Sequence, residues 1–118
     1  MTRTFKTAWF HKQARKAKIS DAQLCKAVTQ IGQGQMVDLG GGVYKKRLDE
    51  NRHRSIILAH SGHFWIYEFL FAKKDRDNID ASELMTFRTL VKAYKGLTST
   101  QLQQLLDEGD FLEICHEA

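Results

Sequence analysis

Basic side chains gather in two stretches near the middle of this 118-residue chain. Arginine offers planar, bidentate contacts to a phosphate group, and lysine offers a mobile point charge. The gathering favours a site for a polyanion over the alternative, in which the charges only protect the edge of a sheet from aggregation. The basic residues of the two stretches are Lys45, Lys46, Arg47, Arg52, His53, Arg54, Lys73, Lys74 and Arg76.

One histidine of this group is a candidate general base. His53 stands between Arg52 and Arg54, and adjacent cations favour the neutral imidazole that a base requires. It would equally serve as a plain loop residue. His60 and His63 flank an expected turn and could meet on a metal ion, but no third ligand follows at a suitable spacing. We therefore expect no metal site.

The charge of the chain is divided along its length. Residues 1–76 carry 15 Lys and Arg against 6 Asp and Glu, whereas residues 77–118 carry 3 against 8. A basic body followed by an acidic segment indicates a polyanionic partner for the body. The composition, 42% hydrophobic and 27% charged, is that of a globular domain and excludes a disordered chain.

Hydrophobic periodicity and capping patterns predict the elements that position these residues. We expect helices near 10–17, 20–31, 80–95 and 98–108, strands over 43–48, 54–60 and 63–73, a short strand at 4–7, and a strand or ordered tail at 111–114. Their order predicts an α+β fold, in which a mostly antiparallel sheet packs against an N-terminal helical hairpin, with further C-terminal helices. We expect a single domain over 1–118, with its core in 1–96 and a C-terminal helix and acidic tail in 97–118.

Strand geometry brings part of the basic group together. Side chains alternate across a strand, so Lys45 and Arg47 share one face. A four-residue hairpin loop places Arg47 opposite Arg54, and a two-residue turn at 61–62 places Arg54 opposite Phe69. Because like charges that face each other destabilise a sheet, this convergence is easier to explain if a polyanion binds there.

The strand over 63–73 is apolar on both faces. Alternation puts Trp65, Tyr67, Phe69 and Phe71 on one face, where they would either stack on RNA bases or form core beneath helices. Their density favours core. A strand buried on both faces lies centrally in its sheet and is covered by helices.

The two cysteines, Cys25 and Cys115, lie far apart and lack metal-binding spacing. We expect no disulfide framework and a reduced chain in the cytoplasm. No apolar run reaches the roughly 18 residues that a membrane span needs, and the N-terminus lacks an apolar signal segment.

The runs LGGGVYKKRL, NRHRSIILAHSG and FLFAKKDRDNID, followed by EL..FR.L, resemble the RelE-type toxins of bacterial toxin–antitoxin modules, most closely the HigB-like branch. The resemblance covers the chain from the helical hairpin to about Gly96. It implies a small antiparallel sheet on a helical hairpin. It also implies an mRNA endoribonuclease, or mRNA interferase, that acts on translated messages in the ribosomal A site. No metal or other cofactor is implied, since the 2′-hydroxyl attacks the adjacent phosphate and yields a 2′,3′-cyclic product.

The resemblance also implies roles for individual residues. Lys45 and Arg47 match a basic pair on the second main strand. Arg54 matches an arginine that would stabilise the transition-state charge on the phosphate. Lys74 falls where many members have an arginine, and Arg76 matches a neighbouring basic position.

The chain departs from the family where many members place a tyrosine near the start of the next helix, because the aligned position here is about Asp80. His53 or Lys45 is therefore our candidate base. The expected catalytic residues are Lys45, Arg47, His53, Arg54 and Lys74, and the expected RNA contacts are Lys46, Arg52, Lys73 and Arg76.

The expected partners are a cognate antitoxin, usually a helix-turn-helix DNA-binding protein in this family, together with the ribosome and mRNA. We expect neither a membrane nor a small-molecule cofactor. Two other functions stay open. A toxin of the same fold could poison DNA gyrase, as related ParE proteins do, or the chain could bind RNA without cleaving it.

Overall fold

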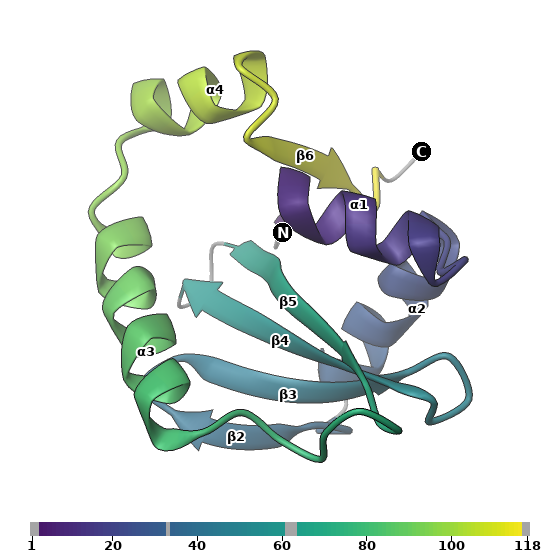
Figure 1. The fold of residues 1–118 in the computed structure, drawn as a ribbon. Helices are drawn as coiled ribbons and strands as arrows, with labels where there is room; N and C mark the ends of the chain where they lie inside the picture. The colour runs from purple at the N-terminus through teal and green to yellow at the C-terminus, as the bar shows by residue number, and fades with distance from the viewer. Residues whose placement is uncertain (1–2, 33, 61–63, 117–118) are drawn as a thin grey trace.

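The computed structural model describes residues 3–32, 34–60 and 64–116 (Figure 1). Its elements are β1 (Arg3–Thr7), α1 (Ala8–Lys16), α2 (Asp21–Gly32), β2 (Val37–Gly40), β3 (Val43–Leu48), β4 (His53–His60), β5 (Phe64–Ala72), α3 (Ala81–Lys95), α4 (Ser99–Asp107) and β6 (Phe111–Ile114). The α+β class is confirmed, and β2 is a strand beyond those expected.

The six strands form one mixed sheet in the order β2-β3-β4-β5-β1-β6. β1 runs parallel to β5, whereas the other neighbouring strands are antiparallel. The mostly antiparallel sheet that the sequence predicts is therefore confirmed, with one parallel junction. Short hairpin connections force antiparallel pairing from β2 to β5, but residues 8–63 separate β1 from β5, so no hairpin fixes their direction.

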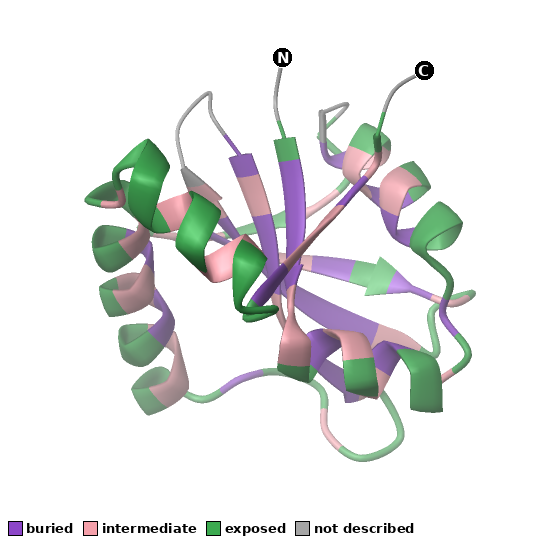
Figure 2. Cartoon of the chain, turned by 90° about the horizontal axis from the view of Figure 1, so that it is seen from above, coloured by how far each residue is buried: buried purple, intermediate pink, exposed green. Residues whose placement is uncertain are grey.

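Helices cover both faces of the sheet. α1 and α2 pack on one face, here called the α1/α2 face, where Phe10 and Leu24 meet Ile57 and Tyr67 in a buried cluster. Figure 2 shows the buried residues along the strands and the exposed ones on the outer sides of the helices. Each such side chain contributes roughly 1.5–3 kcal/mol by leaving water. The packing of α1 against α2 as a hairpin stays a prediction.

The opposite side of the sheet, here called the α3/α4 face, has its own buried cluster. Ile56 and Leu58 of β4 pack there with Phe87 and Val91 of α3. The leucines of α4 lie against the same cluster and are partly buried. The sheet thus lies between two helical layers.

Side-chain caps begin α3 and α4 at the positions that the sequence patterns predict. Asp80 accepts a hydrogen bond from the backbone N–H of Glu83 at 2.8 Å, and the Glu83 carboxylate accepts one from the N–H of Asp80 at 2.9 Å. Thr98 and Gln101 make the same exchange at α4. These bonds satisfy N–H groups that a first helical turn leaves unpaired. The Asp80 side chain therefore serves as the N-cap of α3.

A bulge in β5 divides the aromatic residues of that strand between the two faces. Ile57 pairs with Tyr67 and Ile56 pairs with Phe69, so Glu68 has no partner in β4. Tyr67 belongs to the buried cluster of the α1/α2 face, whereas Phe69 packs on the α3/α4 face. The expectation that the alternating aromatics share one face is therefore wrong, although their role as core is confirmed for these two.

The register between β4 and β5 also differs from the predicted one. Arg54 lies opposite Phe71 rather than Phe69. Because side chains alternate along a strand, this shift of two residues leaves Arg54 on the predicted face. The predicted turn at 61–62 lies outside the described residues.

Cys25 of α2 and Cys115, directly after β6, form a disulfide across a sequence separation of 90 residues. The expectation of two reduced, unpaired cysteines is therefore wrong. β6 joins the sheet beside β1, and its last residue, Ile114, enters the same buried cluster as Leu24 of α2. Only this sheet order brings the two cysteines together, so their spacing in the sequence gives no sign of the bond.

Candidate nucleic-acid interface

The β3–β4 hairpin carries three cations on the α3/α4 face. Arg47 lies opposite Arg54, which confirms the predicted hairpin register, and Lys45 lies opposite Ile56. Arg47 is exposed, Lys45 is half-buried and Arg54 is buried. None of the three cations forms an ion pair within the described part of the chain. The positive charges of these three side chains are therefore not neutralised by an ion pair.

The Arg54 side chain forms hydrogen bonds with the loop that joins β3 to β4. Its Nη1 donates to the backbone carbonyls of Asn51 at 3.0 Å and of His53 at 3.2 Å. A buried guanidinium needs such acceptors because a desolvated charge without partners is costly. Arg54 is thus coupled to the shape of the loop as well as to the charge of this end of the sheet.

Three consecutive residues of that loop have left-handed backbone conformations. The φ angles of Asp49, Glu50 and Asn51 are +53°, +52° and +72°. Each such non-glycine residue costs about 1–2 kcal/mol, least for Asp and Asn. Backbone hydrogen bonds from Arg52 N to Asp49 O at 3.0 Å and from Lys73 N to Arg52 O at 2.9 Å offset this cost. Strain of this kind is typical of functional sites.

Asp49 connects two of the predicted site residues. Its Oδ1 accepts a hydrogen bond from Arg52 Nη2 at 2.9 Å, and its Oδ2 lies 3.1 Å from Nδ1 of His53. The hydrogen bond from Arg52 is the main reason that the pKa of the Asp49 carboxyl lies below its usual value, and His53 adds to it. Sequence reasoning missed Asp49, because its distance of four residues from His53 becomes a contact only when the loop curls back.

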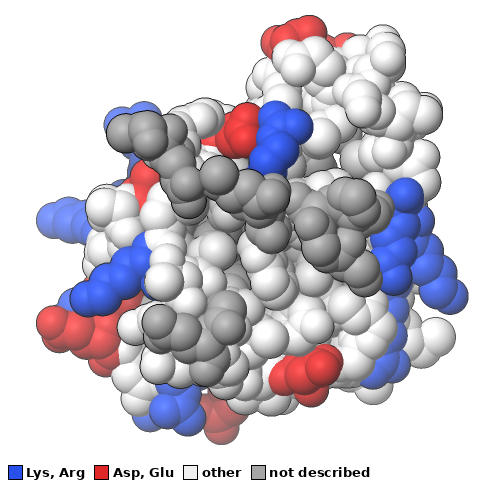
Figure 3. All heavy atoms as spheres, turned by 180° about the vertical axis from the view of Figure 1, so that it is seen from behind, with Lys and Arg blue, Asp and Glu red and all other residues white. Residues whose placement is uncertain are grey.

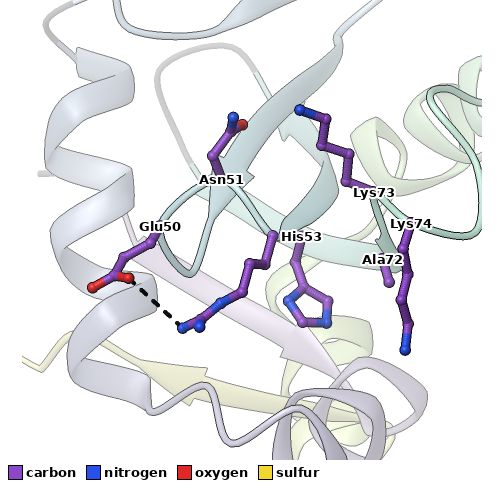
Figure 4. Close-up of a pocket in the computed structure, with 7 residues that line it drawn as sticks. Glu50, Asn51, His53, Ala72, Lys73 and Lys74 are labelled. Atoms are coloured by element: carbon purple, nitrogen blue, oxygen red, sulfur yellow. Dashed lines mark ion pairs between the residues drawn. The ribbon is translucent and has the colours of Figure 1, made fainter.

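His53 faces a cleft of about 640 Å³ where β4 begins and β5 ends. In Figure 4 the His53 imidazole and the Lys74 side chain point to the same side of the strands, whereas Lys73 points to the other side. The volume is typical of ligand pockets. The cleft is lined by Glu50, Asn51, Arg52, His53, Ala72, Lys73 and Lys74.

A second cavity, of about 410 Å³, adjoins this cleft on the side of α1. It shares His53 and Ala72 with the first, and α1 contributes Gln13 and Lys16 to its wall. His53 therefore stands between two hollows. A chain-like ligand that ran from one hollow to the other would cross the imidazole.

Besides Arg52, which is paired with Asp49, two further predicted RNA contacts have a local partner or are buried. Lys46 is only 8% exposed, and burial is the main reason that its pKa is lowered. Arg76 forms an ion pair with Glu83, and its guanidinium carbon lies 5.4 Å from the centre of the Phe71 ring. Arg76 also contributes to the wall of the second cavity. It ties the segment after β5 to the start of α3.

The sheet separates the predicted catalytic residues into two groups at its hairpin end. Neighbouring residues of a strand point to opposite faces, so His53 and Arg54 are directed to different sides. Lys45, Arg47 and Arg54 lie on the α3/α4 face. His53 lies in the cleft with Lys74, which follows the last residue of β5. Within the described residues, no tyrosine lines either cavity.

The acidic C-terminal helix α4 lies away from the hairpin end. α4, which the sequence places in the acidic segment, contains no Lys or Arg. In Figure 1 it lies at the top of the molecule, far from the β3–β4 hairpin. Figure 3, seen from behind, shows Lys and Arg along both flanks and only acidic charge on the projection at the top. α4 therefore does not cover the cleft at His53.

Two absences concern the described residues only. No group of three His, Cys, Asp or Glu side chains there is placed to hold a metal ion. No helix there is both long enough and apolar enough to cross a membrane. His63, one of the two histidines weighed as a metal pair, lies outside the described residues.

A family model described as the RelE toxin of the RelE / RelB toxin–antitoxin system matches residues 2–114. No curated protein and no solved structure matches the chain. The match includes every strand and helix of the structure, from β1 to β6. It confirms the resemblance seen in the strand motifs, and family membership implies a cognate antitoxin. The chain therefore belongs to the RelE family, the toxins of RelE-type toxin–antitoxin systems.

Proposed function

We propose that this RelE-family toxin is a ribosome-dependent mRNA endoribonuclease that inhibits translation. The observation that carries the proposal is the His53 imidazole, held by a carboxylate, in a cleft lined by Arg52, Lys73 and Lys74. An imidazole can exchange a proton near neutral pH, and the surrounding cations attract a phosphodiester. The site thus has the groups that metal-independent cleavage of RNA requires.

In the proposed reaction the RNA supplies its own nucleophile. Nε2 of His53 takes the proton of a 2′-hydroxyl, and the 2′-oxygen forms a bond to the adjacent phosphorus. The bond from phosphorus to the 5′-oxygen breaks, and that oxygen leaves with a proton from a cationic donor, for which Lys74 is our candidate. The products are a 2′,3′-cyclic phosphate and a free 5′-hydroxyl. General acid–base catalysis of this kind contributes about 10²–10⁴-fold.

The remaining cations have electrostatic roles in this proposal. Arg52 and Lys73 hold the RNA backbone at the cleft. Lys45 and Arg47 on the α3/α4 face bind phosphates that flank the reacting one, and Arg54 holds the loop that carries His53 through its bonds to the carbonyls of Asn51 and His53. Lys46 and Arg76 make weaker contributions, because one is buried and the other is paired with Glu83.

The proposed partners follow from the same surface. The substrate is mRNA on the ribosome, which places the action in the cytoplasm. The cognate antitoxin is proposed to be a helix-turn-helix DNA-binding protein with an acidic segment that docks on the basic hairpin end, because complementary charge speeds association.

The test is 5′-end mapping of a reporter mRNA in a purified translation reaction, with and without ribosomes. We expect cuts phased to codons that require ribosomes and are lost in Arg54→Ala. Lys92→Ala, which removes an exposed cation of α3 outside the hairpin end, is the matched control and should cut normally. If well-folded wild-type protein makes no cuts, the proposal fails, and assays of DNA gyrase and of plain RNA binding come next.

A further inference from the structure

We infer that Asp49 is a positioning residue that fixes the protonation of His53, so that Nε2 is the nitrogen presented to RNA. The inference rests on the proposed function, because it concerns the base of that reaction. Its structural part stands on the contact of 3.1 Å between Asp49 Oδ2 and His53 Nδ1.

The chemistry of the two groups decides which nitrogen carries the proton. A neutral imidazole has one N–H donor and one acceptor nitrogen, whereas an ionised carboxylate only accepts. The carboxylate of Asp49 therefore places the imidazole proton on Nδ1. Nε2 is left with a free lone pair, which is the form that can take a proton from a 2′-hydroxyl.

Asp49 also accepts hydrogen bonds from the Arg52 side chain. Arg52 donates to its Oδ1 from Nη2 at 2.9 Å and to its backbone carbonyl from Nε at 3.2 Å. These contacts keep the carboxylate ionised and oriented. The left-handed backbone of Asp49, Glu50 and Asn51 turns the loop back on itself and brings the carboxylate to His53. The left-handed backbone of the loop thus places the Asp49 carboxylate against the His53 ring.

The surroundings of His53 agree with this role. The side chain is 20% exposed, which leaves part of the ring accessible. It borders both the cleft of about 640 Å³ and the cavity of about 410 Å³. Lys73 and Lys74 line one side, and Lys16, Asp75 and Arg76 line the other. Asp49 is the carboxylate bonded to the ring, whereas Asp75 only contributes to a cavity wall.

The first test uses the protein alone, without RNA or ribosomes. Imidazole ¹⁵N chemical shifts report which ring nitrogen carries the proton in the neutral state. We expect His53 of the wild type to carry it on Nδ1. In Asp49→Asn the side-chain amide can donate to Nδ1, so the proton should move toward Nε2. A wild-type spectrum with the proton on Nε2 overturns the inference without any variant.

The second test measures cleavage under single-turnover conditions on ribosome-bound mRNA. We expect Asp49→Asn to lower the maximal rate on the order of 100-fold, with less than a threefold change in the half-saturating concentration. Asp77→Asn removes an exposed carboxylate outside both cavities and should stay within twofold of the wild type.

The outcomes separate this inference from the proposed function. If the wild type cuts but Asp49→Asn cuts at the same rate, Asp49 has no positioning role and the ribonuclease stands. A loss of rate with an unchanged protonation pattern and a lower melting temperature means that Asp49 only stabilises the loop, which overturns the inference. If the wild type never cuts, the proposed function fails, and the spectrum still decides the pairing of Asp49 with His53.

Discussion

At the hairpin end, the two faces of the sheet differ in whether a carboxylate contacts their basic side chains. On the α3/α4 face Arg47 and Arg54 lie opposite each other, with Lys45 beside them and no carboxylate in ion-pair contact among the described residues. In the cleft His53 is bonded to a carboxylate, that of Asp49. The first arrangement destabilises the sheet unless a polyanion binds. The second suits proton transfer. In the proposed function, the first face binds RNA and the second carries out the chemistry.

The largest expected effect is on the cleavage rate, and it tests whether the base lies in the cleft or on the α3/α4 face. His53→Ala should lower the cleavage rate at least about 100-fold, since it removes the proposed base. Lys45→Ala on the other face should weaken RNA binding and lower the rate no more than about tenfold. Rates on ribosome-bound mRNA, with melting temperatures as a check of folding, measure both. The reverse ranking would place the base on the α3/α4 face and contradict the proposed role of His53.

The next effect is on stability and concerns the disulfide between Cys25 and Cys115. Breaking the bond between Cys25 and Cys115 should lower the free energy of unfolding by about 2–4 kcal/mol, because it releases a loop of about 90 residues in the unfolded chain. Denaturant unfolding with and without a thiol reductant measures this. The double variant Cys25→Ser with Cys115→Ser is the control and should not respond to reductant. An equal response of both proteins would show that the cysteines are not bonded.

A smaller effect tests the unneutralised cations. Arg47→Ala should raise the free energy of unfolding by about 0.2–1 kcal/mol, because it removes a like charge opposite Arg54. The same change should weaken RNA binding and reduce the dependence of log affinity on log salt concentration by about one unit. Thermal unfolding and salt titrations of RNA binding supply the two numbers. A loss of stability together with unchanged binding would show that Arg47 is an ordinary structural residue.

The smallest effect concerns Glu68 in the middle of β5, which is half-buried and accepts a hydrogen bond from the Tyr94 hydroxyl at 3.1 Å. Burial raises the pKa of the Glu68 carboxyl, and the bond from Tyr94 offsets this in part. A raised pKa favours folding below the usual value of 4.5, and that contribution is lost as the pH rises through the folded value.

Glu68→Gln should therefore raise the melting temperature by a few degrees at pH 7. The gain should vanish below about pH 4, where the wild-type carboxyl is neutral as well. Glu50→Gln, at a side chain that is 87% exposed, is the matched control and should show no such gain. A lower melting temperature for Glu68→Gln at pH 7 would show that the ionised carboxylate is the stabilising form.

Local patterns were enough to predict much of the fold. The capping residues Asp80 and Thr98 fix where α3 and α4 begin, because a side chain can satisfy a first-turn N–H wherever the chain lies in the fold. The loop length after Leu48 places Arg47 opposite Arg54, because register in a hairpin follows from its turn. The family resemblance likewise rested on motifs within single strands and loops.

Contacts between distant segments were not predictable in this way. The bulge at Glu68 moves Tyr67 and Phe69 to different faces, and nothing in the strand's alternation marks it. The parallel pairing of β1 with β5 and the bond between Cys25 and Cys115 depend on the order of strands in the finished sheet. Hydrophobic patterns specify which face of an element is buried, but they do not specify which neighbour buries it.

The same distinction between local patterns and long-range contacts applies to the candidate site. Residue types and strand patterns were enough to predict a histidine among lysines and arginines at one end of the sheet. The structure was needed to show that β4 already begins at His53, which directs His53 and Arg54 to different faces, and that Asp49 is the carboxylate in contact with the imidazole. The physical reason is that residue chemistry is local, whereas a hydrogen bond requires a backbone path that brings two groups within about 3 Å. That path is the strained loop from Asp49 to Asn51.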